Sequence, residues 1–123
     1  MAEILALDDI RDACVLIGKI LEKKGHRVHS FTEEEEALAF ARQHPVDLAV
    51  LDIKLKRVTG LEVLAGLRAL RPEMGIIMLT GYPTIETARA ALRLGADEYC
   101  VKPIDREELE DKVAAVLQRR KHA

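Results

Sequence analysis

The sequence has few aromatic residues: tryptophan is absent, and two Tyr and two Phe make up only 3% of its 123 residues. This composition argues against a protein that stacks nucleic-acid bases or a flavin on aromatic side chains. Long apolar runs are also missing, since none approaches the ~20 residues of a membrane-spanning helix. The N-terminal segment lacks the basic start and apolar stretch of a secretory signal. We therefore expect a cytoplasmic protein without membrane contact.

Cysteine is equally scarce, and Cys14 and Cys100 have no Cys or His neighbour at metal-ligand spacing. Two isolated cysteines do not make a disulfide framework, so both are predicted to be small buried hydrophobes. Charge of one sign is not in excess either, because 19 basic and 21 acidic residues leave a net charge of −2. Nucleic-acid modules usually carry a basic excess, so we expect no direct nucleic-acid binding.

What the sequence does contain is enough apolar residues (49%) to bury the core of one domain. Five β-type runs alternate with helical patterns: Glu3–Leu7, Arg27–Phe31, Asp47–Leu51, Gly75–Leu79 and Glu98–Val101. The first, third and fourth are almost continuously apolar, as parallel strands covered on both faces are. The second is mixed and is predicted at the sheet edge. The alternation predicts a doubly wound α/β fold.

Two of the helical segments carry specific expectations. The first has five apolar residues with the spacing of a buried stripe: Ala13, Leu16, Ile17, Ile20 and Leu21. The second is predicted to open at Thr32, because Glu35 follows three residues later as in a capping box. The acidic run 33–36 would then be a solvated first turn that suits the helix dipole.

The helical segment from Pro83 to Gly95 leaves two interpretations open. Its apolar and small residues form two stripes: Ala88, Ala91 and Gly95, and Ile85, Ala88 and Leu92. A helix that is apolar on more than one side is either deeply buried or has a partner surface. The neighbouring Tyr99 favours a partner surface.

Polar residues stand at the carboxyl ends of four predicted strands: Asp8 and Asp9, Asp52, Thr80, and Lys102. Ligands of open α/β sheets bind at that edge, so we expect these side chains to converge. Taken singly, each has an ordinary structural interpretation as a helix cap, a turn residue or a surface lysine. Their joint position at the ends of four strands favours a functional site.

The residue types at this edge indicate a chemistry. Carboxylates packed together are unfavourable unless a cation neutralises them, and all-oxygen ligation suits Mg²⁺. A metal and one ammonium can together neutralise the oxygens of a phosphoryl group. A carboxylate in such a pocket can act as nucleophile and form an aspartyl phosphate. Asp52, at a central strand end, is the predicted nucleophile, with Asp8 and Asp9 holding the metal.

Over essentially its whole length, the chain resembles the receiver domain of bacterial two-component response regulators. The matching motifs are Leu7-Asp8-Asp9, Leu51-Asp52-Ile53, Gly60, Leu79-Thr80-Gly81, and Gly95-Ala96-Asp97-Glu98-Tyr99 leading to Lys102-Pro103. The resemblance implies one flavodoxin-like domain over residues 1–123, with five helices, a parallel sheet in the order 2-1-3-4-5, and no effector domain. It also implies a signalling phosphoacceptor that promotes its own phosphorylation and dephosphorylation, rather than an enzyme.

The resemblance implies that Asp52 receives a phosphoryl group from a histidine kinase or a histidine phosphotransfer protein. Mg²⁺, with Mn²⁺ as a substitute, would be held directly by Asp9 and Asp52, through water by Asp8, and by the backbone carbonyl of Lys54. Because Lys54 and Tyr82 occupy positions that tune phosphoryl lifetime in such domains, the core chemistry is implied but its rate is not.

The resemblance also assigns the switch. Lys102 would contact the phosphoryl oxygens, Thr80 would move to bond one of them, and Tyr99 would swing inward. The Lys102-Pro103 bond is expected to be cis. The output face would be the fourth helix, fifth strand and fifth helix, which would bind an output partner or domain, or a second copy of the chain after phosphorylation.

Three other functions fit the residues less well. A small Mg²⁺-dependent phosphatase would need a substrate-binding cap and usually a second Asp where Lys54 stands. A flavodoxin-like FMN carrier would need an aromatic pair and a Ser/Thr-rich phosphate loop. A degenerate receiver that acts only as a scaffold is disfavoured because all five key residues are present.

Overall fold

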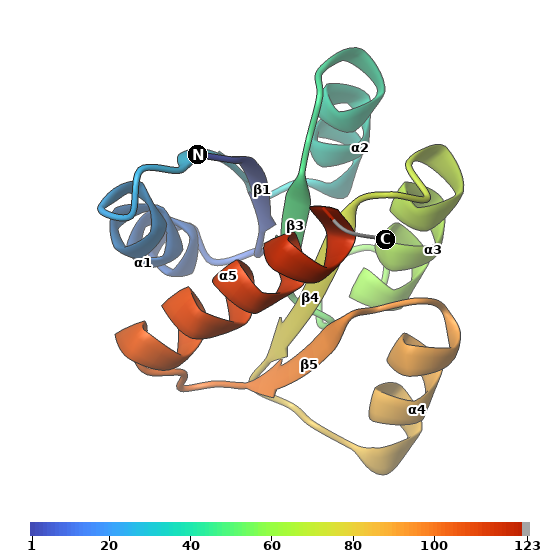
Figure 1. Ribbon diagram of the computed structural model, residues 1–123. Helices are drawn as coiled ribbons and strands as arrows, with labels where there is room; N and C mark the ends of the chain where they lie inside the picture. Colours follow the sequence, from blue (N-terminus) through green and yellow to red (C-terminus); the bar gives the residue numbers. More distant parts are fainter. Residues whose placement is uncertain (122–123) are drawn as a thin grey trace.

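The computed structural model describes residues 1–121 as a five-stranded parallel sheet between two layers of helices (Figure 1). The strands are β1 (Glu3–Leu7), β2 (Arg27–Phe31), β3 (Leu48–Leu51), β4 (Gly75–Thr80) and β5 (Glu98–Val101). The helices are α1 (Arg11–Glu22), α2 (Glu34–Gln43), α3 (Gly60–Leu70), α4 (Ile85–Arg93) and α5 (Arg106–Lys121). The strand order β2-β1-β3-β4-β5 confirms the predicted fold and the predicted edge position of β2.

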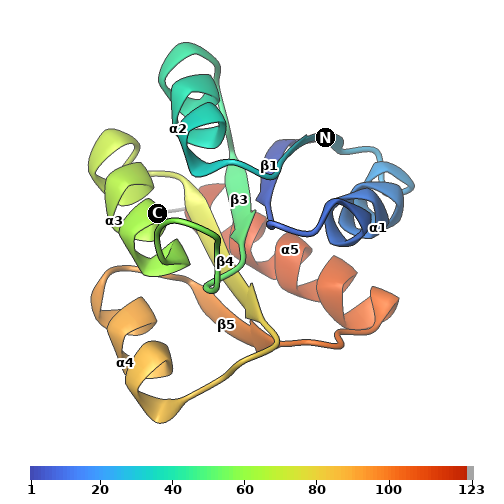
Figure 2. The same ribbon diagram turned by 180° about the vertical axis from the view of Figure 1, so that it is seen from behind.

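Each face of the sheet has its own core. Ile4 and Ala6 of β1 pack in the cluster that α1 and α5 cover, whereas Leu5 and Leu7 pack in the cluster under α2, α3 and α4. Seen from behind, α5 lies beyond the strands and α2, α3 and α4 lie on the near side (Figure 2). Alternate residues of a strand point to opposite faces, so the apolar runs of the central strands are buried on both sides. The two cysteines are buried, as predicted.

The predicted start of α2 is wrong. The structure starts α2 at Glu34, and Glu33 precedes it without a side-chain cap, so Thr32 and Glu35 form no capping box. Residues 32 and 33 form a bend that carries the chain away from the edge strand before the helix begins. The acidic first turn is not fully solvated either, because Glu34 is buried.

The second correction concerns α1. Cys14, Ile17 and Leu21 are buried, but Leu16 is 59% exposed. Cys14, Ile17 and Leu21 lie on the face of α1 that packs against the sheet, and Leu16 lies outside this face. There it lines a shallow apolar groove of about 420 Å³ between α1 and the segment 102–104.

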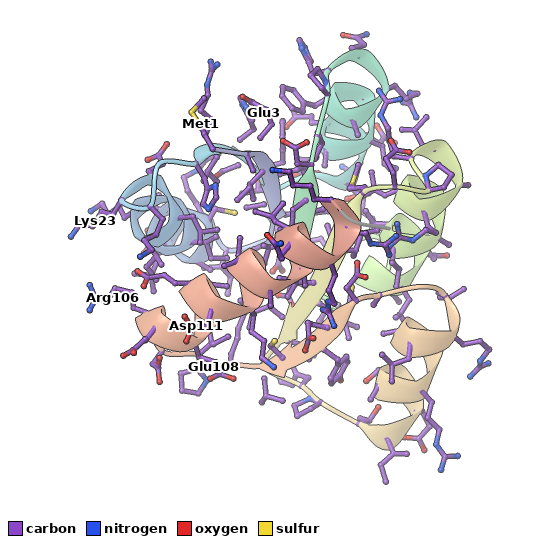
Figure 3. The ribbon with its side chains drawn as sticks, viewed as in Figure 1. Met1, Glu3, Lys23, Arg106, Glu108 and Asp111 are labelled. Atoms are coloured by element: carbon purple, nitrogen blue, oxygen red, sulfur yellow. The ribbon has the colours of Figure 1, made fainter. Side chains whose placement is uncertain are left out.

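The exposure of α4 argues against the interpretation that this helix is deeply buried. Ala91 is the one fully buried residue of this helix, whereas Ile85 is 71% exposed and Leu92 is 59% exposed. The two large apolar residues of the helix therefore face outward, whereas its alanines are buried or half-buried. On the opposite face of the sheet, α5 has a charged outer surface, where Arg106, Glu108 and Asp111 are exposed (Figure 3). Within residues 1–121, no helix combines the length and the apolar content needed to cross a membrane.

A cluster of ion pairs, the Arg68–Asp97–Arg120 clasp, ties the helices together at the amino ends of β4 and β5. Arg68 Nη1 donates to the carbonyls of Pro72 and Met74, at 2.9 Å and 2.5 Å. Its Nη2 donates to Gly95 O at 2.6 Å and lies 3.4 Å from Asp97 Oδ2. Arg120 Nη2 lies 2.9 Å from Asp97 Oδ1. One carboxylate thus joins α3 and α5 across the start of β5.

Candidate functional site

Three carboxylates lie together at the carboxyl ends of β1 and β3. One side-chain oxygen each of Asp8, Asp9 and Asp52 lies within 4.8 Å of the others. Asp8 and Asp52 are buried, at 2% and 7% exposed, and Asp9 is half-buried. Oxygen ligands at this spacing fit a hard divalent cation, and the partly open Asp9 side leaves it a route to water.

Backbone hydrogen bonds that continue past the strands fix these positions. The Asp8 amide donates to Phe31 O at 3.2 Å, and the Asp52 amide donates to Leu7 O at 3.0 Å. At the same end of the sheet, the Lys102 amide after β5 donates to the carbonyl of Thr80 in β4 at 2.8 Å. The site residues therefore stand on the rigid end of the sheet rather than on free loops.

Lys102 brings a positive charge to the carboxylates. Its Nζ donates to Asp8 Oδ2 at 2.5 Å and to Asp52 Oδ2 at 3.3 Å. Burial acts to lower the pKa of Lys102, but the hydrogen bond to Asp8 and the charges of both carboxylates outweigh it and raise that pKa. The ammonium is therefore charged at neutral pH. The Lys102-Pro103 peptide bond is cis.

The backbone also supports Asp52 directly. The Ile53 amide donates to Asp52 Oδ1 at 2.7 Å, while Lys102 bonds the other oxygen. Burial nevertheless raises the pKa of Asp52; the charge of Lys102 opposes this shift and that of Asp8 adds to it. Gly60 packs so closely that a Cβ atom there would overlap the carbonyl oxygen of Asp52. A side chain at position 60 would therefore displace the acidic loop.

Thr80 and Tyr99 lie apart from the carboxylates in their contacts. Thr80 is fully buried at the end of β4, and its Oγ1 accepts a hydrogen bond from the Tyr82 amide at 3.1 Å. Tyr99 is half-buried against the core, and its hydroxyl lies 2.8 Å from Thr87 Oγ1. The Thr80 hydroxyl thus bonds the segment that leads into α4, and the Tyr99 hydroxyl bonds α4 itself.

A further pair joins the two loops that follow β3 and β4. Lys54 Nζ lies 4.3 Å from the ring centroid of Tyr82, within the range of a cation–π interaction. Both residues follow site residues by two positions, Lys54 after Asp52 and Tyr82 after Thr80. The sequence places both near the site, but only the structure shows that their side chains meet.

Comparison with known proteins places this geometry in a family. A model of the response regulator receiver domain matches residues 4–114. The chain is 37% identical over 106 residues to the photosynthetic apparatus regulatory protein RegA of Cereibacter sphaeroides, covering 86% of this chain and 58% of that protein. It is 31% identical to the transcriptional regulatory protein ZraR of Escherichia coli over 115 residues, which cover 94% of this chain and 26% of ZraR.

Solved structures agree with the sequence comparison. A CheY-like receiver domain protein from Methanospirillum hungatei superposes with a TM-score of 0.96 at 34% identity, covering 99% of this chain and 98% of that one. NtrX from Brucella abortus superposes with a TM-score of 0.91 at 33% identity, covering 98% of this chain and 28% of that one. The chain thus spans little more than half of RegA and about a quarter of ZraR. It belongs to the response regulator receiver domain family.

Proposed function

We propose that this receiver domain accepts a phosphoryl group on Asp52 from the phosphohistidine of a histidine kinase or a histidine phosphotransfer protein. The observation that carries the proposal is the Lys102 ammonium, which lies between the carboxylates of Asp8 and Asp52 at the edge where a ligand of this fold binds. It combines a buried carboxylate nucleophile with a fixed positive charge beside it.

In the transfer, an Asp52 carboxylate oxygen forms a bond to phosphorus as the bond from phosphorus to the histidine nitrogen breaks. The electron pair of that bond leaves with the imidazole. Lys102 lies beside Asp52 Oδ2, where it would attract the incoming phosphoryl oxygens. A Mg²⁺ ion held by Asp8, Asp9 and Asp52, with the Lys54 carbonyl, would neutralise charge on the phosphoryl group.

The phosphoryl group would also alter the surface of the domain. It adds about −1.5 to −2 charges at the rim. Thr80 would turn from the Tyr82 amide to a phosphoryl oxygen, and Tyr99 would move inward. Ile85 and Leu92 of α4 and Val101 of β5 are exposed apolar residues, and they would offer contacts to an output partner or domain. Driving such an equilibrium from ~1:99 to ~99:1 takes about 5.5 kcal/mol, so partner binding or dimerisation would supply part of it.

Intact-mass spectrometry after incubation with acetyl phosphate tests the first step. The wild-type chain should gain one phosphoryl group in the presence of Mg²⁺ and none in EDTA, and Asp52→Asn should gain none under either condition. Phosphate release is measured in the same samples, so that rapid dephosphorylation is not mistaken for a failure to be phosphorylated. If neither adduct nor release appears with acetyl phosphate or with a phosphohistidine donor, the proposed function is wrong.

A further inference from the structure

The hydroxyl of Tyr99 bonds to the first turn of α4 at one residue. Tyr99 Oη lies 2.8 Å from Thr87 Oγ1. Thr87 is also half of the capping box that starts the helix: its amide donates to Thr84 Oγ1 at 3.0 Å, and the Thr84 amide donates back to Thr87 Oγ1 at 3.2 Å. The side chain of Thr87 therefore belongs both to the helix cap and to the contact with β5.

The Thr87 hydroxyl makes four polar contacts at the start of the helix. Its Oγ1 accepts the Thr84 amide at 3.2 Å and lies 3.1 Å from the Thr84 carbonyl. The hydroxyls of Thr84 and Tyr99 lie 3.0 Å and 2.8 Å from the same oxygen, so the contact with Tyr99 is the shortest of the four. A threonine hydroxyl has one proton and two lone pairs, so Tyr99 shares the hydrogen-bonding capacity of Thr87 with the cap.

The cap matters because α4 is short and has little fully buried surface. The helix has nine residues, of which Ala91 alone is fully buried. Ile85, the first residue of the helix, lies between the two capping threonines and exposes 71% of its surface. A helix this short is marginal on its own, so the hydrogen bonds of its cap contribute to holding its first turn. Loss of one hydrogen bond in the cap would therefore change the position of Ile85, where the exposed apolar surface of α4 begins.

We propose that Thr87 is a positioning residue that holds Tyr99 and the first turn of α4 in the resting conformation. The proposal rests on the proposed function, in which Tyr99 moves when Asp52 is phosphorylated. An inward movement of Tyr99 breaks its bond to Thr87 and leaves the first turn of α4 with one hydrogen bond fewer. Thr87 thereby sets how strongly the resting state is favoured, and it couples the position of Tyr99 to the apolar surface of α4.

Fluorine NMR of 3-fluorotyrosine can follow Tyr99 directly, because the chain has only two tyrosines. In a Tyr82→Phe background, Tyr99 gives the single resonance. Thr87→Val removes the hydroxyl that Tyr99 contacts and one side of the cap, whereas Thr84→Val damages the same cap at a residue that does not bond Tyr99. Thr87→Ser restores the hydroxyl. Thr87→Ala is a second variant without the hydroxyl and has a better helix former at that position.

Without phosphoryl donor, Thr87→Val and Thr87→Ala should move the Tyr99 resonance towards its position in the phosphorylated parent. The ratio of displaced to resting Tyr99 should rise about fivefold, the factor that corresponds to one hydrogen bond of ~1 kcal/mol. Thr87→Ser should match the parent, and Thr84→Val should change the ratio less than Thr87→Val does.

The inference is overturned if both Thr87 variants leave the resonance in place, or if Thr84→Val displaces it as far as Thr87→Val. Failure of the proposed function gives a different result. Intact-mass spectrometry of the parent would then show no phosphoryl uptake, while the resonances without donor would still decide whether Thr87 holds Tyr99.

Discussion

Lys102 Nζ lies 2.5 Å from Asp8 Oδ2, although 94 residues separate the two in the chain. The same ammonium lies 3.3 Å from Asp52, so it neutralises one charge of the acidic cluster. With Asp9 included, three ionised carboxylates and one ammonium leave a net charge of −2, which a single divalent cation balances. The pocket is therefore electrostatically incomplete without a cation.

The first prediction concerns stability and follows from this excess of negative charge. Burial and the nearby Asp8 disfavour the ionised form of Asp52, so Asp52→Asn should raise the free energy of unfolding in EDTA. The expected gain is on the order of 1 kcal/mol. Added Mg²⁺ should stabilise the wild type more than the variant. Thermal unfolding in EDTA and in Mg²⁺ measures both, and an equal response of the two proteins to Mg²⁺ would contradict the metal site.

The Lys54–Tyr82 pair should protect an aspartyl phosphate from water, because it ties together the loops after β3 and β4. Tyr82→Ala should shorten the half-life of the phosphorylated protein by about twofold to fivefold, the factor expected for an exposed cation–π interaction of ~0.5–1 kcal/mol. Tyr82→Phe keeps a ring and should behave as the wild type. The adduct is followed by intact mass after the donor is removed. An unchanged or longer half-life in Tyr82→Ala would refute this role.

Two glycines of α3 should respond in opposite ways to alanine. A Cβ at Gly60 overlaps the backbone of Asp52, so Gly60→Ala should destabilise the protein by about 2–4 kcal/mol. At Gly66, the nearest atom is Leu38 Cδ2 at an ordinary 3.6 Å, so Gly66→Ala should stabilise the helix by about 0.5–1 kcal/mol. Urea denaturation measures both. Similar effects at the two positions would mean that helix propensity, and not contact with Asp52, decides the outcome.

His26 should contribute to acid sensitivity. Its Nδ1 accepts the Ala2 amide at 3.1 Å, and burial, with the positive N-terminus and Lys24, lowers its pKa below 6.5. As pH falls from 6.5 through this lowered pKa, the unfolded chain takes up the proton more readily, so the folded state loses stability. His26→Asn keeps an acceptor but does not titrate.

The unfolding free energy of His26→Asn should therefore fall less between about pH 7.5 and pH 5.5 than that of the wild type. Urea denaturation at the two pH values provides the comparison. His44→Asn is the matched control, because His44 is exposed. An equal decrease in His26→Asn and wild type would show that other groups carry the acid sensitivity.

The strands were predictable because a parallel strand covered on both faces must be apolar along its length, as β3 is. The start of α2 was not, because Thr32 and Glu35 have the spacing of a cap but the chain needs residues 32 and 33 to turn away from β2. The exposure of Leu16 escaped prediction for a similar reason: spacing shows that residues share a helix face but not how wide an arc the neighbouring elements cover.

The acidic site was predictable from strand ends alone, since the carboxyl ends of parallel strands share one edge. That rule predicts that Asp8, Asp52 and Lys102 converge, and the Lys102 ammonium does donate to both carboxylates. It is silent about contacts that depend on the path of a loop or the placement of a helix. The pairing of Tyr99 with Thr87 is one of these, because nothing in the spacing of the two residues indicates that they meet.

The Arg68–Asp97–Arg120 clasp lies at the amino ends of β4 and β5, whereas Asp8, Asp52 and Lys102 stand at the carboxyl ends of their strands. The two groups of charges share no residue and lie at opposite ends of the sheet. Substitutions in the clasp can therefore change the thermal stability of the domain while the acidic site at the opposite end of the sheet stays the same. For protein engineering, the clasp is the place to strengthen the scaffold away from the residues of the proposed phosphorylation site.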